Sequence, residues 1–111
     1  MRFPEIDQYP DVIRIGKESW KISFSNEVLK SDWAGYCCHE SRTIYLSTGL
    51  GKKETFITLV HELLHAMDFD FEIRIPHRVI YGLEEPLAML LLSAAFAVPN
   101  NPLRRPRSQR S

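Results

Sequence analysis

The spacing of the apolar residues changes once along this 111-residue chain, and that change constrains the fold most. Up to about residue 46, apolar and polar residues tend to alternate, which is typical of half-buried β-strands. From Lys52 onward they recur every three or four positions, which is typical of an amphipathic helix. The helical stripe consists of Phe56, Leu59, Val60, Leu63, Leu64 and Met67. Strands followed by helices predict an α+β domain.

Two β-hairpins are predicted before this helix, because β-favouring runs flank short polar segments. The predicted strands cover residues 11–15, 20–24, 33–39 and 43–46. Together they predict a small, twisted, mostly antiparallel sheet that packs on the helix beginning at Lys52. A C-terminal helix is predicted over residues 84–97, with Pro86 tolerated in its first turn. Residues 71–81 are predicted to form a link, because Pro76 blocks a regular helix there.

Charge and composition limit the classes of partner. The last nine residues hold four arginines and no acid, so the rest of the chain carries 10 basic against 14 acidic groups. We therefore expect one domain over residues 1–100 and a basic, disordered tail over residues 101–111. The acidic body argues against nucleic-acid binding, except for weak contact through the tail.

Apolar runs and cysteines limit the compartment. The longest apolar run is too short to span a bilayer, and the N-terminus has no secretory signal pattern, so no membrane association is expected. Cys37 and Cys38 are adjacent, and neighbours in a strand point to opposite faces. A disulfide between them is not expected, which favours a reducing, cytoplasmic setting.

The predicted helix carries the sequence His61-Glu62-Leu63-Leu64-His65. Residues four apart lie on one helix face, so both imidazoles can reach one ion. Both histidines point away from the apolar stripe, so we expect them to face a cleft or solvent. Zn²⁺ suits this pair, since a catalytic zinc uses three protein ligands and a water. Glu62 is placed to accept a proton from that water.

A third ligand must come from another element. Glu85, at the start of the predicted C-terminal helix, is favoured over Glu84, because one of two acids in a first turn can simply complement the helix dipole. His77 is a rival ligand. Cys37 and Cys38 are further candidates as thiolate ligands, although a buried strand thiol is commoner. Supporting candidates are Tyr81 and His77 as donors to an oxyanion and Asp68 as a partner of His65.

Residues 58–66 resemble the active-site helix of H-E-x-x-H zinc metallopeptidases. With Gly35-Tyr36 opening a hairpin, the strand at 42–46 and a closing helix that starts with glutamate, the layout over residues 20–99 is similar to minimal zincins often carried by phages, and to the ImmA/IrrE and SprT-like groups. The resemblance implies His61 and His65 as ligands, Glu62 as general base, and a peptide lying along the edge strand, expected at Thr43–Leu46.

The same resemblance leaves the third ligand open. The spacing from His65 to Glu85 is similar to that in thermolysin-like enzymes, although Glu84 stands where an asparagine usually precedes the glutamate. The SprT-like pattern uses a histidine instead, which keeps His77 as an alternative. The sequence thus predicts a zinc metallopeptidase acting on a peptide or protein. The alternatives are a non-catalytic, zinc-stabilised interaction domain and a deformylase-like amide hydrolase with a cysteine ligand from an upstream strand.

Overall fold

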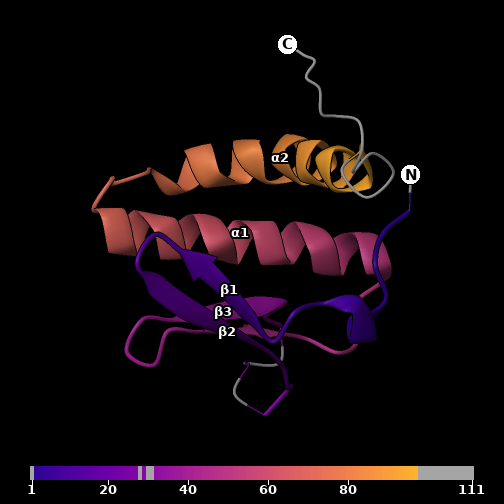
Figure 1. Cartoon of the computed structure of the whole chain (residues 1–111). Coiled ribbons are helices and arrows are strands. Elements are labelled where there is room, and N and C mark those ends of the chain that lie inside the picture. The colour runs from indigo at the N-terminus through magenta and orange to yellow at the C-terminus, as the bar shows by residue number, and fades with distance from the viewer. Residues whose placement is uncertain (1, 28, 30–31, 98–111) are drawn as a thin grey trace.

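The computed structural model describes residues 2–27, 29 and 32–97 and confirms the predicted α+β class. A sheet, helix α1 and helix α2 form three successive layers, with α1 in the middle (Figure 1). A short 3₁₀ helix over Ile6–Gln8 precedes the first strand. The other elements are β1 (Val12–Ile15), β2 (Glu18–Phe24), β3 (Gly35–Cys38), β4 (Thr43–Leu46), α1 (Lys52–Phe71) and α2 (His77–Ala97). The predicted tail, residues 101–111, lies outside the described residues.

The sheet has the strand order β1-β2-β4-β3. Both predicted hairpins form, since β1 pairs with β2 and β3 with β4 in antiparallel fashion. The hairpins join through β2 and β4, which run parallel, with Ile22 opposite Ile44. The prediction that Thr43–Leu46 is an edge strand is therefore wrong. Ile44 and Leu46 are fully buried, and a central position covers them on both sides, whereas β3 takes the edge.

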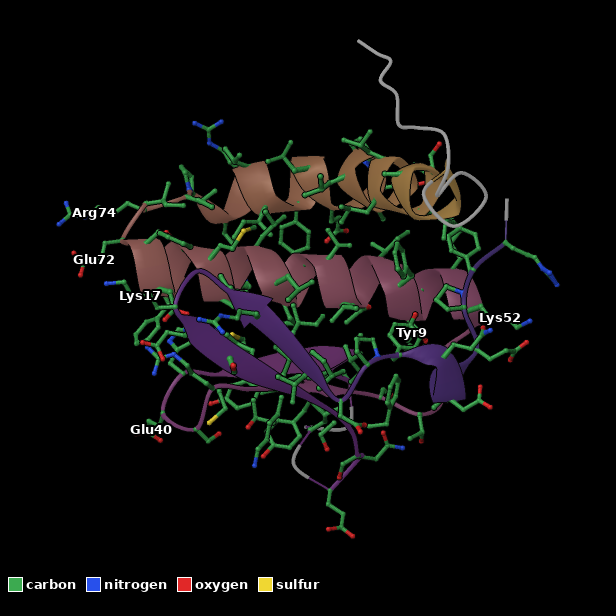
Figure 2. The ribbon with its side chains drawn as sticks, in the orientation of Figure 1. Tyr9, Lys17, Glu40, Lys52, Glu72 and Arg74 are labelled. Carbon is green, nitrogen blue, oxygen red and sulfur yellow. The ribbon has the colours of Figure 1, made fainter. Side chains whose placement is uncertain are left out.

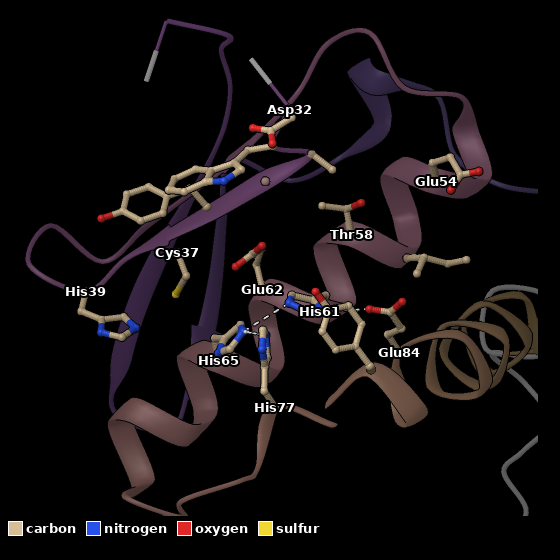
Figure 3. A pocket seen from close by; sticks show the side chains of 16 residues that line it. Asp32, Cys37, His39, Glu54, Thr58, His61, Glu62, His65, His77 and Glu84 are labelled. Atoms are coloured by element: carbon tan, nitrogen blue, oxygen red, sulfur yellow. Dashed lines mark hydrogen bonds and ion pairs between the residues drawn. The ribbon is translucent and has the colours of Figure 1, made fainter. Parts of the chain in front are cut away.

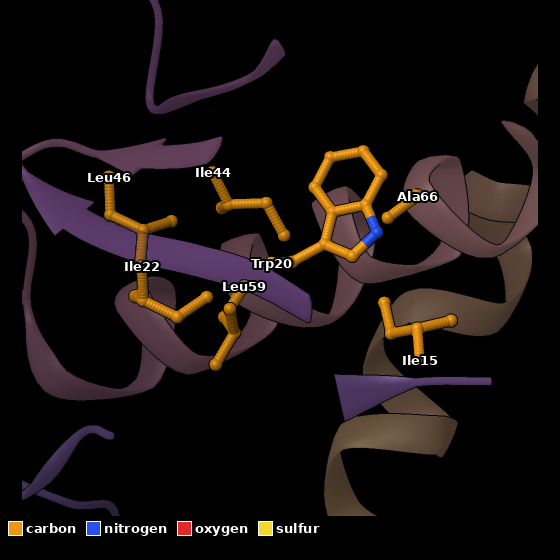
Figure 4. Packing of buried hydrophobic residues seen from close by; sticks show 7 residues of the cluster. All are labelled: Ile15, Trp20, Ile22, Ile44, Leu46, Leu59 and Ala66. Carbon is orange, nitrogen blue, oxygen red and sulfur yellow. The ribbon is translucent and has the colours of Figure 1, made fainter. Parts of the chain in front are cut away.

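The main core lies between the sheet and α1. Figure 4 shows Trp20, Ile44 and Leu59 in this cluster, together with Ile15, Ile22, Leu46 and Ala66. Trp20 is fully buried, and its indole N–H donates to the Asp70 carboxylate at 2.7 Å. A second cluster, centred on Val60, Leu64, Ile80 and Ala88, joins α1 to α2. Helix α1 is thus covered on two sides, and the remaining face is available for a site.

Helix α2 begins at His77 and not at Glu84, so the predicted boundary is wrong. The carbonyl of Pro76 accepts hydrogen bonds from the N–H groups of Val79 and Ile80. Pro76 therefore precedes the first helical turn, a position that a proline tolerates, and does not interrupt it. Because the helix starts earlier, its first turns lie beside the middle of α1.

Pro86 lies inside α2 and not in its first turn. A proline has no N–H to donate to the carbonyl four residues back, and its ring crowds that carbonyl, so helices bend at such positions. Figure 1 shows α2 changing direction along its length. In the link between the helices, Glu72 and Arg74 have left-handed φ values of 53° and 66°, and their side chains point outward (Figure 2).

In the part of the chain that the structure describes, neither helix combines the length and the apolar character that crossing a membrane requires.

Candidate metal centre

An open cleft of about 660 Å³ lies over the uncovered face of α1. Its walls are β3 with the residues just before it on one side and the first turns of α2 on the other (Figure 3). His61, Glu62 and His65 line it from α1, as the phase of the apolar stripe predicts. The volume lies within the range of small-molecule and peptide sites.

A third imidazole reaches this cleft from the first residue of α2, His77. The Nε2 atom of His65 lies 3.2 Å from Nε2 of His61 and 3.2 Å from Nε2 of His77. The ligand atoms of the three residues all lie within 4.8 Å of one another, close enough to hold one metal ion. Around a tetrahedral zinc with Zn–N bonds of about 2.0–2.1 Å, two nitrogens are about 3.3–3.4 Å apart. The separations of His65 from His61 and from His77 are close to this spacing.

Glu85, the predicted third ligand, and Glu84, its alternative, both lie outside the histidine cluster. Glu85 is exposed, and its carboxylate pairs with the Lys53 ammonium at 3.2 Å. Glu84 turns toward the cleft, where an oxygen of its carboxylate lies 2.7 Å from Nδ1 of His61. Among the described residues, the candidate metal cluster consists of the three histidines and includes neither glutamate. The structure thus brings His61 and His65 together with His77, the alternative third ligand.

Glu62 is buried, with 7% of its surface exposed, although its side chain lines the cleft. Burial, followed by the negative charge of Glu84, raises its pKa to about 7. A carboxylate whose pKa lies near neutrality suits proton transfer, because it can both accept and release a proton at working pH. Figure 3 shows its carboxylate on the β3 side of the imidazoles, across the site from Glu84.

His65 is the central member of the cluster. Burial, followed by the neighbouring His61 and His77, lowers its pKa below the usual value. A lowered pKa keeps the imidazole neutral, which is the form that binds a metal. Asp68, predicted as a partner of His65, instead accepts the backbone N–H of Ile75 at 2.9 Å and so anchors the link between the helices.

Cys37 and Tyr81 complete the surroundings of the site. Both cysteines are free thiols, and Cys37 lines the cleft. Burial, followed by the charge of Glu62, raises the pKa of the Cys37 thiol to about 12, so it stays protonated near neutral pH. The exposed ring of Tyr81 lies against two histidines, with centroids 5.1 Å from His61 and 4.7 Å from His77.

Gly35 allows β3 to approach the α1 face closely. A Cβ atom at this position would lie 2.7 Å from Cγ2 of Thr58, 3.1 Å from the Tyr45 carbonyl oxygen and 3.2 Å from Oε2 of Glu62. The absence of a side chain is therefore required for the packing of this strand beside Glu62. In the sequence Gly35 indicates only the start of a hairpin, because the residues that it packs against are distant along the chain.

We expect Gly35→Ala to destabilise the fold by about 1–3 kcal/mol, the usual cost of forcing extra atoms into a packed region. Chemical denaturation measures this change. Gly49→Ala is the matched control, because a Cβ there meets only Ser47 Oγ at an ordinary 3.9 Å. Adding Thr58→Ser to Gly35→Ala removes the closest clashing methyl group and should restore part of the loss. Equal stability of the Gly35 and Gly49 variants would contradict the close approach.

Comparisons with protein-family models, with curated proteins and with solved structures found no match to this chain. The three-histidine cluster, which could hold a metal ion, is therefore the feature from which a function is inferred. Its third member, His77, is a rival to Glu85 in the sequence, and a helix that begins directly after Pro76 favours it. His77 is then the first residue of that helix and faces α1.

Proposed function

We propose that this protein is a zinc-dependent peptidase in which His61, His65 and His77 hold the ion. The observation that carries the proposal is the convergence of three imidazole Nε2 atoms from two helices, beside a buried glutamate, in an open cleft. Three nitrogen ligands leave one tetrahedral position free, as in catalytic and not structural zinc sites. When bound, zinc polarises a carbonyl and lowers the pKa of a coordinated water to about 7.

The protein's own residues supply the proton transfer. Glu62 follows His61 on α1 and lies in the cleft outside the histidine cluster. In this proposal its carboxylate accepts a proton from the attacking water and delivers it to the leaving amine. The Tyr81 hydroxyl, on the opposite wall, donates a hydrogen bond to the oxygen of the scissile carbonyl.

The substrate is proposed to be an extended peptide. β3 is an edge strand of the sheet and forms one wall of the cleft, so its free backbone groups can pair with an added strand. Trp33 and Tyr36 stack on each other at 5.5 Å on this wall and offer an aromatic surface to side chains of the peptide. This placement replaces the expected contact with β4, which lies inside the sheet.

A deformylase-like reaction has less support. That alternative needs a cysteine of an upstream strand as a metal ligand. In the described part of the chain, the candidate metal cluster is formed by histidines without a cysteine.

The proposal is tested on the full chain by measuring metal content and hydrolysis together. We expect about one zinc ion per chain, cleavage of fluorescently labelled casein, loss of cleavage after chelation, and recovery when zinc is returned. Protein that neither contains zinc nor gains thermal stability from it would overturn the metal centre. Protein that binds zinc and leaves casein and mixed peptide libraries intact would instead support the zinc-stabilised interaction domain.

A further inference from the structure

We propose that Glu84 is a positioning residue, whose carboxylate holds the His61 ring so that Nε2 faces the metal position. This inference rests on the proposed metal centre and adds to it a group that does not touch the ion. Its basis is the 2.7 Å contact between Oε1 of Glu84 and Nδ1 of His61. Such a short distance is typical of a hydrogen bond to an ionised acceptor.

The contact fixes which nitrogen of His61 is available. An ionised carboxylate can only accept hydrogen bonds, so Nδ1 of His61 must carry the proton and donate it. Nε2, the other ring nitrogen, is then the one that can offer a lone pair to a metal. That same Nε2 atom lies 3.2 Å from Nε2 of His65, on the side of the ring where the three histidines converge. Figure 3 shows Glu84 and the other two imidazoles on opposite sides of the His61 ring.

The contact is sheltered from water. The His61 and Glu84 side chains are only 14% and 24% exposed. A partly buried hydrogen bond to a charged group is worth more than an exposed one, because solvent competes with it less. Metal-binding histidines commonly donate their second ring nitrogen to a carboxylate, which orients the ring and makes it a stronger ligand.

The same helix supplies two parts of the site. Glu84 lies seven residues after His77, and residues that far apart occupy nearly the same face of an α-helix. Helix α2 therefore contributes a ligand from its first residue and the partner of a second ligand two turns later. Glu85 is rotated by about 100° from Glu84 and pairs with Lys53 outside the cluster.

The experiment compares Glu84→Ala and Glu84→Gln with Glu85→Ala, which removes a neighbouring carboxylate of the same helix. We expect Glu84→Ala to weaken zinc binding by about 10- to 100-fold in a chelator competition, as is typical for such outer partners. Glu84→Gln should lose less, because its amide oxygen can still accept the hydrogen bond. Glu85→Ala should bind zinc like the wild type, since its ion pair is exposed.

Imidazole ¹⁵N NMR supplies a second readout that a purely structural contact would not move. In the metal-free wild type, we expect the His61 proton on Nδ1, and Glu84→Ala should shift it toward Nε2. Unchanged zinc affinity together with an unchanged His61 tautomer in Glu84→Ala would overturn the positioning role. A loss of zinc affinity as large as that of His65→Ala would make Glu84 a direct ligand and would overturn it as well.

The two proposals fail in different ways. If the wild-type chain binds no zinc, the proposed function is excluded, whatever the tautomer of His61. If the wild-type chain binds zinc and Glu84→Ala changes neither the zinc affinity nor the His61 tautomer, only the role of Glu84 is excluded.

Discussion

Glu62→Gln is expected to keep the fold and the zinc while lowering the rate of peptide hydrolysis by about 10²- to 10⁴-fold, the usual contribution of a general base. Glutamine has nearly the same size and can hydrogen-bond, but it cannot accept a proton from water. Glu62 is 7% exposed, and glutamine fills nearly the same space, so the replacement should not weaken the packing around this side chain. Cleavage of labelled casein by zinc-loaded protein measures the rate, and metal analysis measures the zinc.

The matched control is Glu54→Gln, which changes an exposed glutamate of the same helix and the same cleft two turns earlier. This variant should cleave at nearly the wild-type rate. Loss of zinc from Glu62→Gln would make Glu62 a ligand. A normal rate in zinc-loaded Glu62→Gln would leave the metal centre in place and exclude the proposed proton transfer.

The position of the histidine pair could be predicted because it depends on local geometry alone. The apolar stripe of α1 fixes which face packs against the sheet and α2, and the spacing of His61 and His65 then places both on the remaining face. The two hairpins could be predicted for the same reason, because each depends on residues that are close in sequence. Their strands are close in sequence, and β-favouring runs around a short turn are enough to indicate them.

The order of the hairpins in the sheet could not be obtained in this way. Either β3 or β4 could have paired with β2, since both arrangements are compatible with the same alternation of apolar and polar residues. The outcome depends on burial: Ile44 and Leu46 of β4 are fully covered in the centre, and Gly35 lets β3 pack over Thr58 at the edge. Such packing involves residues that are distant in sequence, which residue patterns do not specify.

The sequence favours Glu85 as the third ligand because it predicts that the last helix begins at Glu84. That boundary follows if Pro76 interrupts a helix, whereas in the structure the proline precedes the first turn of α2. A helix that begins at His77 carries that imidazole to His65 and points Glu85 toward Lys53. A difference in one helix start thus changes which side chain faces the histidine pair.

The third ligand can be tested by the thermal stability that zinc confers. For the wild type, free zinc at 100 times its dissociation constant should stabilise the fold by about 2.7 kcal/mol, which raises the melting temperature by about 10–20 °C in a domain of this size. We expect His77→Ala to lose nearly all of this shift at the same zinc concentration. His77 is exposed at the first residue of α2, so its removal should change the metal-free melting temperature little.

Glu85→Ala provides the opposite expectation and the control. It removes an exposed ion pair with Lys53, which is worth less than about 1 kcal/mol. The melting temperatures with and without zinc should therefore fall by the same small amount. The zinc-induced shift should therefore stay at the wild-type value. If Glu85→Ala lost the shift and His77→Ala kept it, the ion would be held as in the thermolysin-like pattern. Helix α2 would then have to rotate on α1 when zinc binds, breaking the contact between Glu84 and His61.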